Sequence, residues 1–288
     1  MAVTATSHFN NGIVGTPQIG ADVDIYESHA TPKFAIGTGF ERSDGAKFRY
    51  SHFGVNTLPG VLVSTDFSES NQVRTSVGIV ISSSATAVGD EAIKPGTKGS
   101  RYVEIIFASI TANKYAGGYL VICEDSGAGY TYRVKGNTAT NSPVSGNFRL
   151  ELYQPLQETV TNASDWAIFG SKYANLEAHT QGTDAAIAGV TVSDIKVATA
   201  AYGWIQTKGI LGVLIDDTSG VATDIGAPVA ISEALPGGIM VAGADVGSLT
   251  QGSLAAELNN IMRRPIVGRL LMTVPAASAH AVVDLNVD

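Results

Sequence analysis

The stretch Tyr202-Gly-Trp-Ile-Gln-Thr-Lys-Gly209 alternates in side-chain character, and the apolar run Ile210–Ile215 follows it directly. A period of two residues is typical of a β-strand, because successive side chains of a strand point to opposite faces of a sheet. The run ends at Asp216-Asp-Thr-Ser-Gly220, whose residue types favour a turn. This part of the chain therefore predicts a long strand followed by a turn.

The same alternation recurs in the block from 101 to 156. Three segments of this block place apolar or aromatic residues on one face and mostly polar residues on the other: Val103-Glu-Ile-Ile-Phe107, Tyr130-Thr-Tyr-Arg-Val-Lys135 and Phe148-Arg-Leu-Glu-Leu-Tyr153. The loop Glu124–Gly129 contains two glycines and separates Tyr119–Cys123 from the second of these segments. Strands with one apolar and one polar face predict an antiparallel sheet that is packed on one side.

Both ends of the chain also have strand patterns. Phe34-Ala-Ile-Gly37 and Lys47-Phe-Arg-Tyr50 flank the turn sequence Arg42-Ser-Asp-Gly45, whose Asp-Gly pair suits the positive φ of a hairpin. Phe48 and Tyr50 are predicted on one face of that strand. Pro265–Met272 and Ala281–Val287 read as closing strands.

Helical signals are few. The segment 253–264 has apolar residues on one stripe, two arginines at its C-terminal end and Pro265 directly after it, so we predict a short helix there. A helical turn or two could also lie around Thr161–Ala167. The fold class predicted is mainly β, with antiparallel barrel or sandwich domains, this short helix and an extended N-terminal arm.

The domain organisation follows from these patterns. Residues 1–30 show no sustained period and are predicted to form the arm, followed by a β domain over 31–160 and a C-terminal barrel-like domain over 161–288. In an alternative arrangement, residues 101–156 form an inserted protruding sheet. Segments 34–65 and 185–288 then belong to one unit.

Composition excludes several classes of protein. Only 15% of the 288 residues are charged and the formal net charge is −8, which argues against nucleic acid as a partner. No apolar stretch has the length of a membrane helix, and Met1–His8 lacks the features of a secretory signal. Cys123 is the one cysteine and, within an apolar run, is predicted to be buried. We expect a protein that is made in the cytoplasm and stays soluble until it assembles.

No group of residues has the spacing of a catalytic, metal or cofactor site, so we expect a protein that is not an enzyme and has no cofactor. The five histidines never occur at metal-ligand spacing, and no Gly-x-Ser-x-Gly nucleophile motif is present. Asp216, Asp217 and Asp224 crowd one loop and could bind a hard cation, but solvated aspartates are common in turns. We favour the solvated interpretation.

Five residues are candidate interface residues. Phe9, Ile13 and Val14 are apolar residues of the predicted arm, and Tyr202 and Trp204 share one strand face. Tyrosine and tryptophan dominate interface hot spots. For Trp204, a position in the core is the preferred alternative.

Several segments resemble the strands of β-rich head proteins of tailed bacteriophages. The resemblance covers most of residues 34–288 in order, in the following segments: Phe34–Thr38, Ser43–Gly45, Phe48–Tyr50, Tyr202–Gly209, Pro265–Arg269 and Val282–Asn286. It implies a capsid decoration or cement protein on the outer surface of the virion. Its partners would be the major capsid protein and further copies of itself, as a homodimer or homotrimer, with no catalytic residues.

Two other functions remain as alternatives. A host-recognition or carbohydrate-binding virion protein would use the tyrosines of the 101–156 block as a sugar platform, namely Tyr119, Tyr130, Tyr132 and Tyr153. A β-rich hydrolase would need a cleft with carboxylates of perturbed pKa.

Overall fold

The computed structural model describes residues 23–66, 72–75, 94–107, 110–140, 146–180, 185–216, 225–232, 234–242, 265–272 and 280–287. Within these residues the chain folds into antiparallel sheets and contains no helix, which confirms the mainly β prediction. The helix predicted for 253–264 lies outside the described residues.

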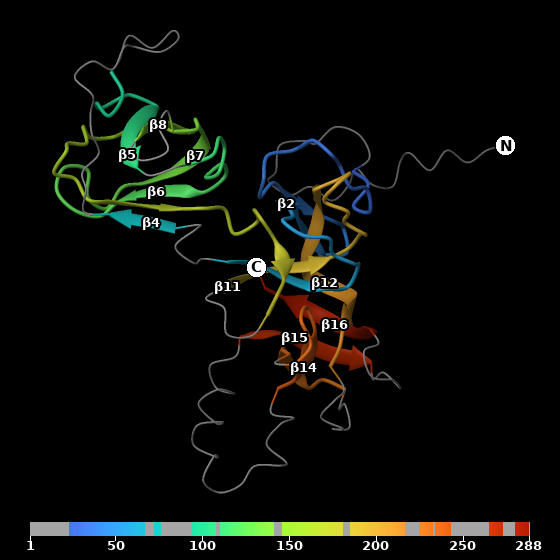
Figure 1. Ribbon diagram of the computed structural model, residues 1–288. Coiled ribbons are helices and arrows are strands. Elements are labelled where there is room, and N and C mark those ends of the chain that lie inside the picture. The colour runs from blue at the N-terminus through green and yellow to red at the C-terminus, as the bar shows by residue number, and fades with distance from the viewer. Residues whose placement is uncertain are drawn as a thin grey trace, which may run out of the picture. The chain divides into compact units, whose positions relative to one another are not determined.

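The chain divides into two compact units. Unit 1 combines Met1–Asp66 with Tyr173–Asp288, and unit 2 is the continuous segment Phe67–Lys172 between them (Figure 1). The expected division near residue 160 is therefore replaced by a nested one. The alternative arrangement also placed one segment inside another unit, but its inserted segment, residues 101–156, is shorter than unit 2.

Unit 1 contains a ten-stranded sheet in the order β10-β3-β11-β12-β16-β15-β13-β14, with β2 paired to β12 and β1 to β2. Its strands have the following bounds: β1 Gly39–Glu41, β2 Lys47–His52, β3 Leu62–Asp66, β10 Glu177–Ala178, β11 Ala185–Thr191, β12 Tyr202–Leu214, β13 Pro228–Ile231, β14 Ile239–Val241, β15 Ile266–Met272 and β16 His280–Asn286.

The long strand β12 organises unit 1. Its first half pairs with β2 and its second half, from Lys208 to Leu214, pairs with β16. The change of partner falls at a bulge between Gln206 and Lys208, and Gly209 next to it has a φ of 100°. A left-handed backbone of this kind is accessible to glycine at low cost, so Gly209 permits the bend.

The sheet curls back on itself at the end of β12. Ile215 forms a parallel bridge with Ile239 of β14, and the backbone N–H of Asp216 donates to the Ile239 carbonyl at 2.8 Å. Strands β12, β16, β15, β13 and β14 thus surround a core that includes Val213, Leu270 and Val283, all fully buried. This part of unit 1 is barrel-like, as expected.

The predicted hairpin at the start of unit 1 is confirmed in its turn and second strand, but its first strand is Gly39–Glu41 and not the predicted Phe34–Gly37. β1 pairs with β2, and the turn between them places Gly45 at a φ of 83°. Phe48 and Tyr50 of β2 are fully buried, whereas Lys47 and Arg49 are only half-buried. Together with Trp204, Phe48 and Tyr50 form an aromatic core.

Unit 2 contains a six-stranded sheet in the order β4-β9-β6-β7-β8-β5. Its strands, most of them green in Figure 1, have the following bounds: β4 Gln72–Thr75, β5 Tyr102–Phe107, β6 Tyr119–Ile122, β7 Thr131–Asn137, β8 Gly146–Leu152 and β9 Trp166–Phe169. The predicted alternation holds along β8, where Phe148, Leu150 and Leu152 are buried and the residues between them are not. The buried side chains of the sheet form one core around Trp166.

Two local predictions for unit 2 were wrong. The helical turn expected around Thr161–Ala167 is a short turn at Asn162–Ala163 followed by β9. Cys123, predicted to be buried, is exposed, because β6 ends at Ile122 and the chain leaves the sheet there. The apolar run extends one residue beyond the strand.

Candidate functional site

Three side chains form a row across the sheet of unit 2, on the face opposite its core. Tyr119 of β6 pairs in register with Arg133 of β7, and the backbone N–H of Tyr153, just after β8, donates to the Arg133 carbonyl at 3.0 Å. Neighbours across an antiparallel ladder share a face, so the three side chains lie side by side. Tyr119 is 48% exposed and Tyr153 37%. We call Tyr119, Arg133 and Tyr153 the aromatic–arginine row.

Charged groups hold this face in a defined arrangement. The Arg133 guanidinium lies over the ring of Tyr153, 5.0 Å from its centroid. Lys135 pairs with Glu151 and Arg149 with Glu104, each at 2.6 Å. The face thus carries two exposed tyrosine rings, one of them in a cation–π contact with a guanidinium.

Only part of the tyrosine set named in the sequence analysis is available to a ligand. Tyr130 is 41% exposed, but it lies in the turn between β6 and β7 and is not part of the row. Its ring stacks on the ring of Tyr132, and the two ring centroids are 6.1 Å apart. Tyr132 is only 3% exposed, and its hydroxyl accepts a hydrogen bond from the backbone N–H of Gln157 at 3.0 Å. The alternation along β7 predicts that Tyr132 and Val134 lie on the same, apolar face of the strand. The burial of Tyr132 could therefore be predicted from the sequence.

Unit 1 exposes apolar side chains on one face of its curled sheet. Val282 of β16 pairs with Gly212 of β12 on one side and with Met272 of β15 on the other. Ile210, two residues before Gly212, is 65% exposed, and Met272 is 54% exposed. We call Ile210, Val282, Leu271 and Met272 the apolar face. This face was not predicted from the sequence. Ile210 nevertheless lies two residues after the exposed Lys208 and therefore on the same side of β12.

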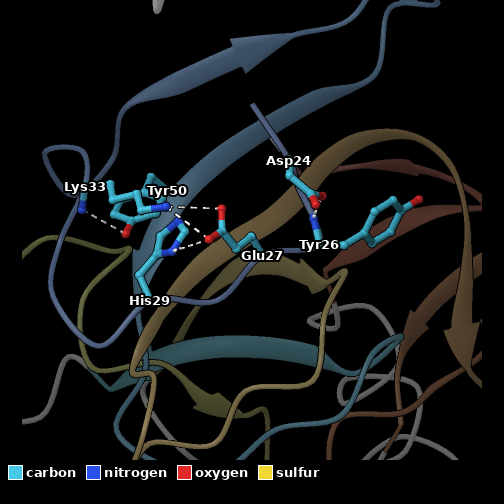
Figure 2. A network of polar contacts seen from close by, with 6 residues as sticks. All are labelled: Asp24, Tyr26, Glu27, His29, Lys33 and Tyr50. Atoms are coloured by element: carbon cyan, nitrogen blue, oxygen red, sulfur yellow. Dashed lines mark hydrogen bonds and ion pairs between the residues drawn. The ribbon is translucent and has the colours of Figure 1, made fainter. Parts of the chain in front are cut away.

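The first described residues of unit 1, before β1, are fixed to its sheet. His29 and Tyr202 exchange two backbone hydrogen bonds, at 2.7 and 3.0 Å. Figure 2 shows the polar contacts around His29: the ammonium of Lys33 pairs with Glu27 at 3.1 Å, and the backbone N–H of Lys33 donates to the hydroxyl of Tyr50 at 3.1 Å. Residues 23–30 were predicted as part of the arm and are instead anchored here.

Burial controls the protonation of this anchor. Loss of hydration lowers the pKa of His29, and the nearby Lys33 ammonium lowers it further. At neutral pH the contact of His29 with Glu27, at 3.7 Å, therefore joins a neutral imidazole to a carboxylate. Burial also raises the pKa of Tyr50, so its phenol stays protonated.

The structure places the predicted interface residues in different settings. Trp204 is fully buried among the aromatic core side chains, which is the core position that the sequence analysis preferred for it. Tyr202 is half-buried and stacks on Tyr50 at 6.3 Å. The arm residues Phe9, Ile13 and Val14 lie outside the described residues.

Two polar clusters have structural roles. The buried carboxylate of Asp216 accepts a hydrogen bond from the hydroxyl of Ser232 at 2.6 Å, and Asp217 and Asp224 lie outside the described residues. Ser64 and His179 form a hydroxyl–imidazole contact at 3.1 Å. Both side chains are buried in unit 1 and a substrate cannot reach them.

Comparison of the chain with protein-family models, with curated proteins and with solved structures finds no match in any of the three. Among the residues that the structure describes, no group of three or more His, Cys, Asp or Glu side chains could hold a metal ion. The same residues include no helix that is long and apolar enough to cross a membrane.

Proposed function

We propose that this protein is a capsid decoration protein of a tailed bacteriophage. It binds the outer surface of the major capsid protein lattice and holds neighbouring subunits together, as a dimer or trimer of itself. The proposal starts from the resemblance of the strand segments over residues 34–288 to phage head proteins. The observation that carries it in the structure is the apolar face of unit 1.

The apolar face has the properties of a docking surface. Met272 is the register partner of the half-buried Val282, and Ile210 lies diagonally from Val282, directly opposite Asp284, so two strongly exposed apolar side chains share one sheet face with a charged residue. Soluble proteins seldom leave such groups together without a partner. A protein that binds the assembled lattice and not free subunits stabilises the assembly by mass action, and many bound copies add their effects.

The anchored segment supports the same role. Backbone hydrogen bonds between His29 and Tyr202 fix the point from which the preceding residues extend along the sequence. In the proposal, these residues reach a neighbouring capsid subunit, and Phe9, Ile13 and Val14 contribute its apolar contacts.

Particles depleted of the protein and reconstituted with it test this function. We expect reconstituted particles to survive heat and osmotic shock better than depleted ones. Ile210→Glu and Met272→Glu should each weaken binding to the particle, because they put a charge into an apolar contact. Val55→Glu is the matched control, since Val55 is 44% exposed outside this face. Equal survival of both kinds of particle would reject the proposal.

A second candidate function is carbohydrate binding by a host-recognition protein of the virion. The observation that favours it is the exposure of Tyr119 and Tyr153 on the same sheet face, beside Arg133. Binding of whole particles to host-cell glycans, compared with particles that lack the protein, tests it. Unchanged binding would count against this function without affecting the first.

A further inference from the structure

We propose that the free protein forms a symmetric dimer in which the apolar face of unit 1 is covered by the same face of a second copy. The inference concerns the protein before it meets a capsid, and it goes beyond the proposed function. On a particle, the capsid lattice of that function takes the place of the second copy. The basis of the inference is one row of residues that crosses the face.

Four exposed residues form a continuous row across four adjacent strands, in the order β12, β16, β15 and β13. Ile210 pairs in register with Asp284, and Asp284 pairs with Arg269 on its other side. Arg269 in turn pairs with Pro228. All four residues are exposed, and directly opposed residues of an antiparallel ladder share a face. We call these four residues the mixed row, because its order is apolar, negative, positive, apolar.

The mixed row is complementary to itself under a two-fold rotation. If the axis lies between two packed sheets, parallel to the strands and midway between β16 and β15, each row meets its own copy in reverse order. Asp284 of each copy then faces Arg269 of the other, and Ile210 faces Pro228. An axis across the strands would instead place Asp284 on Asp284. Complementary charge therefore selects the axis parallel to the strands, and the symmetry repeats every contact twice.

The neighbouring row is apolar under the same rotation. Val282, two residues before Asp284 on β16, pairs in register with Met272 of β15. The rotation that brings Asp284 onto Arg269 also brings Val282 onto Met272 of the second copy. Met272, which is 54% exposed, is thereby covered, as is Ile210, which is 65% exposed. Removal of such apolar surface from water is the main favourable contribution to association.

The two charges of the mixed row are available to a second copy. Within the part of the chain that the structure describes, neither Asp284 nor Arg269 takes part in an ion pair. In the dimer each of these charges has neighbours of opposite sign on its own sheet and on the facing one. Four charges that alternate in this way attract one another.

We expect the dimer to be weak. Neighbouring strands are about 4.8 Å apart, so the mixed row spans only about 14 Å. Small interfaces are typical of transient contacts. Two copies that each have a net charge of −8 also repel one another at long range. A weak contact suits a surface that the capsid lattice takes over from the second copy.

Sedimentation velocity of the full chain over a concentration series tests the proposal. We expect the wild-type chain to change reversibly from monomer to dimer as its concentration rises. Arg269→Glu and Asp284→Arg should each weaken dimerisation at least about tenfold, because each change makes both facing pairs like-charged. An equimolar mixture of these two variants should form a heterodimer, because every facing pair of charges is then opposite in sign.

Other variants separate the charge pattern from total charge and from folding. Lys94→Glu and Glu124→Arg are the matched controls, because they make the same changes of charge at exposed residues of unit 2. Both should dimerise as the wild-type chain does. The double variant Arg269→Glu/Asp284→Arg keeps a self-complementary row and should dimerise again. Circular dichroism and thermal unfolding establish that each variant is folded.

Each contrary result overturns a defined part of the proposal. A wild-type chain that stays monomeric at every concentration, or that forms trimers, would overturn the dimer. Full dimerisation of both single variants would overturn the assignment to this face. Single variants that fail to dimerise alone and also fail as a mixture would overturn the two-fold arrangement. The reconstituted particles measure capsid binding separately, so failure of the dimer and failure of the proposed function are distinguishable.

Discussion

Gly118, immediately before β6, is the position where a single methyl group should disturb unit 2 most clearly. A Cβ added there would lie 2.0 Å from the carbonyl oxygen of Phe169 and 3.0 Å from the carbonyl carbon of Gly170. Both neighbours are backbone atoms, so the contact is relieved only if β6 and β9 separate. We predict that Gly118→Ala lowers the free energy of unfolding of unit 2 by about 3 kcal/mol, the upper end for an overpacked interior.

Gly129 is the matched control in the same unit. Its φ is +86°, and a Cβ at this position would meet no heavy atom within 4 Å. Gly129→Ala therefore incurs only the cost of a left-handed backbone, about 1 kcal/mol. For a unit of this size the two costs correspond to decreases in Tm of roughly 13 °C and roughly 5 °C.

The two tryptophans report on the units separately. Trp166 belongs to unit 2 and Trp204 to unit 1, and both are fully buried. Urea unfolding followed by fluorescence, in Trp204→Phe and Trp166→Phe backgrounds, gives one transition for each unit. Gly118→Ala should lower the midpoint reported by Trp166 and leave that of Trp204 unchanged. Equal shifts of both transitions, or an effect no larger than that of Gly129→Ala, would refute the reasoning.

Three further predictions concern titratable and reactive groups. Burial lowers the pKa of His29, His52 and His179 below 6.5, so the unfolded chain takes up protons first as the pH falls. The urea midpoint of unit 1 should therefore decrease between about pH 7.5 and 5.5, whereas unit 2, which has no histidine, should keep its own; a constant midpoint for unit 1 contradicts this. Burial raises the pKa of Tyr115 to about 12, and its hydroxyl has no hydrogen-bond partner. Tyr115→Phe should leave unit 2 as stable or up to about 1 kcal/mol more stable in the same unfolding assay, and a clear loss of stability argues against an unpaired hydroxyl. Cys123 is exposed, so a thiol reagent should modify it fully in the native protein, and protection until unfolding would disprove that exposure.

The sequence predicted the local structure of the sheets well. Where one face is buried and the other is wet, as along β2 and β8, the period of two residues identifies the strand and its buried side chains. The prediction failed at β9, because Trp166, Ala167 and Ile168 are all buried and leave no alternation to read. It also failed at Cys123, because the apolar run in the sequence continues one residue beyond the end of β6.

Strand pairing at long range could not be predicted. Nothing in the sequence shows that β2 pairs with β12 across about half of the chain, or that β12 changes partner at the bulge between Gln206 and Lys208. The aromatic–arginine row shows the same limit. The alternation along β7 placed Arg133 on the polar face, but only the register brings Tyr119 and Tyr153 to its two sides.

The chain leaves and rejoins unit 1 at neighbouring points. β3 ends at Asp66 and pairs with β10 through Ser64 and Glu177, and the hydroxyl of Thr65 donates to the carbonyl of Ala174 at 2.9 Å. Contacts within unit 1 therefore hold the two ends of the inserted segment close together. The entropic cost of closing this loop depends only weakly on the number of residues in the inserted segment. Unit 1 is a scaffold with a ready-made grafting point, at which a foreign domain with adjacent termini could replace residues 67–172 while the host fold is kept.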